Sequence, residues 1–186
     1  MPSDEEILQK IIEFADESHD QQIRRYTGDR YIVHPVRVME LCRKYNDNIS
    51  VLSAAILHDV LEDTPVTRDE LELFLLQMLP EDNARFTLEL VEQLTDEFVK
   101  DKYPKWNRRK RKNKEAERLA AASAEAQTIK YADIIDNAPE ITEKDPEFAE
   151  RFLRECRALV KMMKKGNPLL REKAFDTVNN CLSQLE

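Results

Sequence analysis

The stretch Val51-Leu52-Ser53-Ala54-Ala55-Ile56-Leu57-His58-Asp59-Val60-Leu61-Glu62-Asp63 decides the fold class. Its first part is apolar on nearly every side, which is typical of a helix at the centre of a bundle. Its second part carries four ionisable groups on the same predicted helix. Charges beside so apolar a segment are costly unless they are paired or bind a metal ion. We therefore predict a central helix that ends in a chemically active segment.

Further helices are predicted on both sides of this segment from capping residues and apolar periodicity. Two sequences match the capping box, Ser3 with Glu6 and Thr67 with Glu70. Asp145-Pro146 and Asn167-Pro168 match an N-cap followed by proline at the first helical position. Pro35 is predicted to start a helix, and another is expected from about Ala124 to Asp136, stopped before Pro139. The stretch from His19 to Arg30 reads as a loop, with His19 at the surface or in the first helix.

Length and composition favour one all-α domain. The 186 residues fit a single domain, and no internal repeat or linker divides them. The chain has only two glycines, Gly28 and Gly166, which excludes the Walker A loop and the glycine-rich Rossmann turn. We predict a single compact helical bundle over residues 1–186.

Charge and targeting features limit the partners and the compartment. A net charge of −8 does not suggest a general nucleic-acid binder. No apolar run approaches the ~20 residues needed to span a bilayer, so no membrane partner is expected. The first residues are acidic where a signal peptide would be basic, which favours a cytoplasmic location. Three cysteines without a CxxC pair are expected to be buried free thiols.

Two residues outside the central helix extend its ionisable cluster. His34 lies at the start of the predicted second helix, and Asp133 lies close to the apolar stripe of a later helix. Imidazole and carboxylate together suit Mn²⁺, Fe²⁺, Zn²⁺ or Ni²⁺, and such an ion would supply a hydroxide near neutral pH. The residue types alone leave alternatives open. His34 could be a hydrogen-bonding residue at a helix end, and Asp133 a buried capping or salt-bridge residue.

Three segments resemble the HD-domain metal-dependent phosphohydrolases, and in particular the hydrolase domain of the RelA/SpoT family. They are Arg25-Tyr26-Thr27-Gly28-Asp29-Arg30-Tyr31-Ile32-Val33-His34-Pro35, Leu57-His58-Asp59-Val60-Leu61-Glu62-Asp63-Thr64, and Ile129-Lys130-Tyr131-Ala132-Asp133 with Asn137. With their spacing they cover about residues 11–140. The chain has no room for a synthetase domain or regulatory domains, and so it resembles the single-domain small alarmone hydrolases.

The resemblance implies a function and a role for each matching residue. It implies removal of pyrophosphate from the 3′ position of guanosine tetra- and pentaphosphate, the alarmones of the stringent response, with one Mn²⁺ per chain. The metal ligands would be His34, His58, Asp59 and Asp133. Glu62 and Asp63 would position or deprotonate the attacking water and help the leaving group. Arg25 would contact the base, and Asn137 the nucleotide. The expected partner is thus a small-molecule nucleotide, and the oligomeric state, including a homo-oligomer, is left open.

Two departures from the family pattern concern the nucleotide. Tyr26 stands where the family commonly has a basic residue, and Ala138-Pro139-Glu140 replaces polar residues that reach the substrate. Two alternatives are therefore kept: an HD phosphomonoesterase acting on another nucleotide, and a non-catalytic HD scaffold that binds a nucleotide or a protein. The basic run at residues 108–114 reads either as a solvated helix face or as a mobile segment that meets the phosphates of the substrate.

Overall fold

The computed structural model describes residues 2–185, which form ten helices and no β-strand within that range. The all-α class predicted from the sequence is therefore confirmed. The helices gather in two compact units, Met1–Thr95 and Asp96–Glu186. The single domain over residues 1–186 stays a prediction. None of the described helices is both long enough and apolar enough to cross a membrane.

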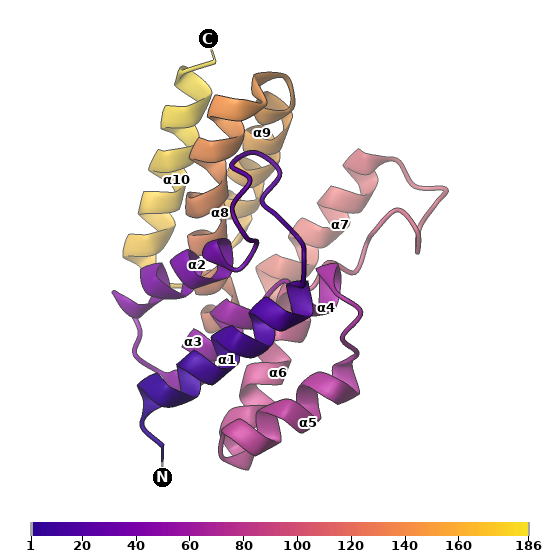
Figure 1. Ribbon diagram of the computed structural model, residues 1–186. Helices are drawn as coiled ribbons and strands as arrows, with labels where there is room; N and C mark the ends of the chain where they lie inside the picture. Colours follow the sequence, from indigo (N-terminus) through magenta and orange to yellow (C-terminus); the bar gives the residue numbers. More distant parts are fainter. Residues whose placement is uncertain (1, 186) are drawn as a thin grey trace. The chain divides into compact units, whose positions relative to one another are not determined.

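The first unit is built around α3, which packs against α1, α2 and α6 (Figure 1). Every residue of α3 after its first is buried, as the apolar sequence of this segment predicts. The shorter α5 packs on α6 and on α1. The helices of this unit are α1 (Asp4–His19), α2 (Val33–Arg43), α3 (Ile49–Leu57), α4 (Val60–Asp63), α5 (Arg68–Met78) and α6 (Glu81–Leu94).

The central helix differs from the prediction of one continuous helix over residues 51–63. It ends at Leu57, and a four-residue helix, α4, begins at Val60 after the turn formed by His58 and Asp59. Neighbouring residues on a helix point in different directions. At this break His58 Nε2 and Asp59 Oδ2 lie 3.0 Å apart. Apolar periodicity gives no sign of the break, because Val60 is buried like the residues of α3.

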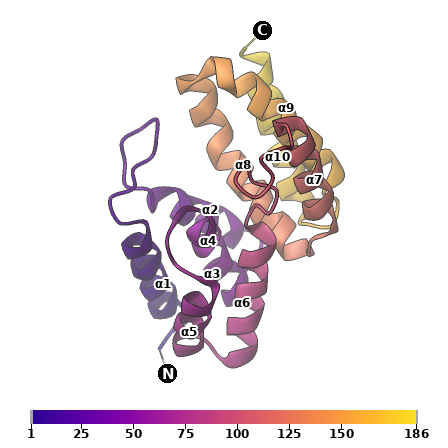
Figure 2. The same cartoon turned by 90° about the vertical axis from the view of Figure 1, so that its right-hand side faces the viewer.

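In the second unit, α8, α9 and α10 run side by side and α7 packs on α9 (Figure 2). The buried side-chain amide of Gln127 connects the ends of these helices by hydrogen bonds. The Nε2 group of Gln127 donates to the carbonyls of Leu119 at 3.0 Å and Ala120 at 3.1 Å, and its Oε1 accepts from the N–H of Lys165 at 2.8 Å. The helices of this unit are α7 (Arg108–Ala121), α8 (Ala124–Lys144), α9 (Pro146–Met162) and α10 (Pro168–Ser183).

Local capping signals predicted the starts of α1, α5, α9 and α10, whereas α2 begins at Val33, two residues before the proline predicted to start it. Both capping boxes form with the side-chain and backbone bonds expected of them. The two predicted N-caps that precede prolines also accept backbone N–H bonds, at the starts of α9 and α10. Each of these signals depends on a few neighbouring residues, so the sequence contains all that is needed to recognise it.

The prediction that Pro139 stops its helix was wrong, because α8 continues through it to Lys144. Proline in a helix interior removes one backbone hydrogen bond and is normally unfavourable by about 3 kcal/mol. Here Ala138, Ile141 and Thr142 are buried on the continuing helix. Packing of α8 against its neighbours therefore outweighs the local cost of the proline.

Gly166 provides a test of how tightly the second unit is packed. A methyl group at this position would meet a ring carbon of Tyr131 at 2.6 Å and the backbone nitrogen of Thr128 at 2.9 Å. Backbone atoms cannot move aside cheaply, and overpacking of this kind typically costs about 1–3 kcal/mol. We expect Gly166→Ala to lower the free energy of unfolding by that order in chemical denaturation. The exposed Lys164→Ala serves as the neighbouring control, and equal stability of the two variants would contradict the tight packing.

Candidate metal centre

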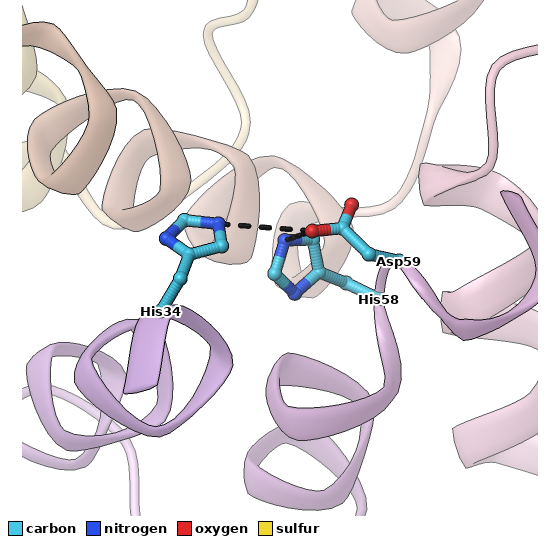
Figure 3. A group of neighbouring side chains, drawn as sticks. All are labelled: His34, His58 and Asp59. Atoms are coloured by element: carbon cyan, nitrogen blue, oxygen red, sulfur yellow. Dashed lines mark ion pairs between the residues drawn. The ribbon is translucent and has the colours of Figure 1, made fainter. Parts of the chain in front are cut away.

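Three of the four predicted metal ligands come together in the first unit. His34 lies in the first turn of α2, and His58 and Asp59 form the turn between α3 and α4. Figure 3 shows both imidazole rings facing the carboxylate of Asp59. Each of the three offers a ligand atom, and these atoms all lie within 4.8 Å of one another. The segments from which they come are held together by the packing of α2 on α3.

The contacts of this cluster converge on a single carboxylate oxygen. Asp59 Oδ2 lies 3.0 Å from His58 Nε2 and 3.7 Å from His34 Nε2, and it accepts a hydrogen bond from the Tyr31 hydroxyl at 2.7 Å. The two histidines are almost fully buried, at 1% and 3% exposure, while the Asp59 side chain is 20% exposed. The cluster is therefore buried on the side of the histidines and open at the carboxylate.

The protonation of His58 shows that this donor set suits a cation. Its Nδ1 lies 2.8 Å from the carbonyl of Ala55, which can only accept, so Nδ1 carries the proton. In the neutral ring Nε2 then presents a lone pair to the Asp59 carboxylate. A divalent metal ion can bind both the Nε2 lone pair and the carboxylate. A carbonyl that accepts a hydrogen bond from the remote ring nitrogen is the usual arrangement for a histidine ligand. The cluster is thus a candidate divalent-metal site.

The two acids proposed for catalysis lie just beyond the cluster, on α4. Both Glu62 and Asp63 are exposed. Partial desolvation and the nearby negative charge of Asp59 raise the pKa of the Asp63 carboxyl, although hydrogen bonds from Tyr31 and Gln22 and the proximity of His19 oppose this rise. Asp63 is therefore a more basic carboxylate than an ordinary surface aspartate.

Asp133 lies in the second unit, on α8. It is 7% exposed, and both of its oxygens are engaged: Oδ2 pairs with Lys130 Nζ at 2.8 Å, and Oδ1 accepts from Asn137 Nδ2 at 2.6 Å. A buried carboxylate on a largely apolar face is what the sequence predicted. Its role as the fourth ligand, and that of Asn137 toward the nucleotide, stay predictions.

The loop between α1 and α2 contains two arginines in different environments. Arg25, the predicted base contact, is exposed, and its guanidinium lies 5.1 Å from the centre of the Tyr26 ring. Arg24 is 7% exposed, although nothing in its local sequence sets it apart from its neighbour. The loop forms a turn in which the N–H of Arg24 donates to the Asp29 carbonyl at 2.8 Å and the N–H of Gly28, at φ +77°, donates to the Arg24 carbonyl at 3.1 Å.

The basic run at residues 108–114 forms the start of α7 and is largely engaged in local pairs. Arg108 makes a bidentate contact with Glu155 at 2.7 and 2.8 Å, Lys112 pairs with Asp96 at 2.8 Å, and Lys114 pairs with Glu117 at 2.6 Å. Much of this charge is balanced within the unit, as expected for a partly solvated helix face.

Sequence reasoning missed two residues next to the cluster, His19 and Tyr31. His19 was expected to be at the surface or in the first helix; it is the last residue of α1 and is buried, at 4% exposure. It continues the i, i+4 series of the buried residues Ile11 and Ala15, and this signal could have placed it. Tyr31 lies one turn before His34, in the segment of residues 25–35 that resembles the RelA/SpoT hydrolase domain, but no role was predicted for it.

Comparison with known proteins agrees with this geometry. Residues 31–138, more than half of the chain, match the HD domain family. The chain belongs to the HD-domain family. The matched region contains all four predicted metal ligands and both acids of α4.

Several relatives are hydrolases of guanosine nucleotides. The chain is 32% identical over 150 residues to the human guanosine-3′,5′-bis(diphosphate) 3′-pyrophosphohydrolase MESH1, covering 79% of this chain and 76% of that protein. The Xenopus tropicalis MESH1 is 29% identical over 181 residues, with 93% of each chain covered. A guanosine-3′,5′-bis(diphosphate) 3′-pyrophosphohydrolase of Spiroplasma citri is 46% identical over 68 residues, but the match spans only 9% of that longer protein.

One solved structure has the same fold. It is described as a metazoan ortholog of SpoT that hydrolyses ppGpp and plays a role in starvation responses. It superimposes with a TM-score of 0.78 and 23% sequence identity, covering 97% of each chain. The similarity extends over all the helices described above and confirms the HD-type helical architecture.

The position of Asp133 leads to a test by metal analysis. If Asp133 completes the metal centre, Asp133→Ala should lose tightly held Mn²⁺ after desalting. The substitution removes one of four protein ligands and one negative charge from the site. Glu143→Ala, which removes an exposed carboxylate from the same helix, should keep the metal content of the wild type. The measurement is elemental analysis of both variants, with circular dichroism to verify the fold. Full metal content in Asp133→Ala would remove this residue from the site.

Proposed function

We propose that the chain is a metal-dependent hydrolase that removes pyrophosphate from the 3′ position of guanosine tetra- and pentaphosphate. The observation that carries this proposal is the convergence of two buried imidazoles on one carboxylate oxygen, within a segment that matches the HD domain family. The relation to the MESH1 hydrolases over most of the chain supports the choice of substrate.

The resident metal is proposed to be Mn²⁺, one ion per chain. His34, His58, Asp59 and Asp133 would hold it, and two imidazoles with two carboxylates form a mixed set that suits Mn²⁺. When bound, a divalent ion supplies Lewis acidity and positive charge toward phosphate oxygens.

The acids of α4 are proposed to move the protons of the reaction. Asp63 lies close enough to Asp59 for the two charges to interact, so its carboxylate is placed to accept a proton from the attacking water. Glu62, exposed on the same short helix, would give a proton to the ribose 3′ oxygen as the bond from this oxygen to phosphorus breaks. General acid–base help of this kind is typically worth ~10²–10⁴-fold in rate.

The nucleotide contacts are proposed to come from Arg25 and Asn137. The guanidinium of Arg25 is exposed on an ordered turn and already lies beside an aromatic ring, so it can stack on a purine as well. Asn137 lies one helical turn after Asp133 on α8, and its Nδ2 donates to the carboxylate of Asp133 at 2.6 Å. The proposed partner is thus a small-molecule nucleotide and neither a nucleic acid nor a membrane, and the proposed location is the cytoplasm.

A nucleotide panel tests the proposal directly. The wild-type chain is incubated with Mn²⁺ and, separately, with guanosine and adenosine nucleotides that carry a 3′-diphosphate or a 3′-monophosphate. We expect inorganic pyrophosphate from the guanosine 3′-diphosphates. Release of orthophosphate from a monophosphate would instead indicate a phosphomonoesterase, and no turnover of any nucleotide would indicate a non-catalytic scaffold.

The roles of Glu62 and Asp63 predict a loss of rate without a loss of structure. Glu62→Gln and Asp63→Asn keep the size of each side chain but remove its basicity. Both variants should bind Mn²⁺ and melt as the wild type does, yet lose at least about two orders of magnitude in kcat. Asp69→Asn, an exposed acid at the start of α5, is the matched control. Wild-type kcat in both α4 variants would leave the pair a structural role only.

Arg25 is predicted to act on binding rather than on the chemical step. Stacking of a guanidinium on a purine is worth ~0.5–2 kcal/mol, so Arg25→Ala should raise KM by a modest factor with little change in kcat. Because the side chain is exposed, the melting temperature should hardly move. Steady-state kinetics and thermal unfolding of the variant decide the matter, and unchanged kinetics would exclude Arg25 from the substrate site.

A further inference from the structure

The residue that contacts the Asp59 carboxylate most closely is not one of the predicted metal ligands. The Tyr31 hydroxyl donates to Asp59 Oδ2 at 2.7 Å, shorter than the distance from that oxygen to either histidine. A carboxylate oxygen has two lone-pair directions, and this bond uses one of them. The same oxygen lies 3.0 Å from His58 Nε2 and 3.7 Å from His34 Nε2, and a metal ion held by these residues would bind between them.

The Tyr31 ring is held on one face by His19. Their ring centres are 4.4 Å apart with a tilt of 34°, and the ring of His34 meets Tyr31 edge-on at 6.0 Å. His19 is buried at 4% exposure at the end of α1. Tyr31 is thus enclosed between a metal-ligand candidate and a histidine that no proposed step of hydrolysis uses.

His19 is itself fixed by the loop that follows it. Its Nδ1 lies 2.9 Å from Gln22 Oε1, which can only accept, so Nδ1 carries the proton. The N–H of Tyr31 donates to the Gln22 carbonyl at 3.0 Å, and the N–H of Gln22 donates to the His19 carbonyl at 2.8 Å. Gln22 therefore connects the backbone that carries Tyr31 with the side chain on which the Tyr31 ring rests.

We propose that Tyr31 is a positioning residue of the metal centre: its hydroxyl orients the Asp59 carboxylate toward the ion, and His19, held by Gln22, keeps the Tyr31 ring in place. This inference rests on the proposed function, because it assigns His34, His58 and Asp59 to a metal ion. Asp59 stands in a turn and its carboxylate is 20% exposed, so packing leaves its side chain more than one staggered rotamer, and the hydrogen bond from Tyr31 selects among them. Partners of this kind typically change metal affinity 10–100-fold when they are removed.

The test measures binding of Mn²⁺ alone, without nucleotide, by isothermal titration or by competition with a chelator. Tyr31→Phe removes only the hydroxyl, so its Kd for Mn²⁺ should rise about 10–100-fold while the melting temperature of the metal-free chain changes little. Tyr45→Phe is the matched control: the same atom is removed from a half-buried tyrosine of the same unit, and its Kd should equal that of the wild type.

A double-mutant cycle tests the part played by His19. His19→Ala should weaken Mn²⁺ binding in the wild-type background, but in the Tyr31→Phe background it should change Kd by less than about twofold, because the hydrogen bond that it supports is already gone. Wild-type affinity in Tyr31→Phe would overturn the proposal, and full additivity of the two substitutions would overturn the role of His19. A wild-type chain that binds no Mn²⁺ would overturn the metal centre itself, a result distinct from both.

Discussion

The site depends on one interruption of a buried helix. The apolar segment of α3 must be covered on all sides, and this places its last residue, Leu57, deep in the first unit. The two residues that follow are therefore held at the edge of the core whatever their polarity. Because the helix breaks there, Asp59 turns toward His58, with a backbone conformation of φ −99° and ψ −6° near the sparsely populated bridge region. Burial of α3 thus determines where the histidine and carboxylate meet.

Electrostatics then determines what can occupy the point where they meet. Two nearly buried imidazoles and a carboxylate oxygen are all electron-pair donors, and a low-dielectric environment increases the cost of leaving such groups without a positive partner. The Tyr31 hydroxyl, which donates to Asp59 Oδ2 at 2.7 Å, provides part of this compensation.

Sequence patterns predicted the parts of the fold that depend on neighbouring residues, and missed those that depend on tertiary packing. The capping boxes at Ser3 and Thr67 involve residues three apart, and both form. The continuation of α8 through Pro139 depends on packing by residues distant in sequence. For the candidate site, the sequence identified His34, His58 and Asp59, which the structure brings together. It did not assign a role to Tyr31 or His19, because a hydrogen bond from a loop residue to a candidate metal ligand produces no periodic pattern in the sequence.

Asp133 shows how the second unit stabilises a buried acid before any ion is bound. Lys130 and Asn137, three residues before it and four after it on α8, each take one of its oxygens. A buried carboxylate is tolerated when its charge is paired and its lone pairs are used. Coordination of a metal by Asp133 would use the second lone pair of one oxygen or replace one of these two contacts. Lys130 is the contact whose positive charge a cation can replace, whereas Asn137 can keep its bond and hold the carboxylate in orientation. The roles predicted for Asp133 and Asn137 are therefore physically coupled, and substitution of Asn137 should affect the metal centre as well as the nucleotide.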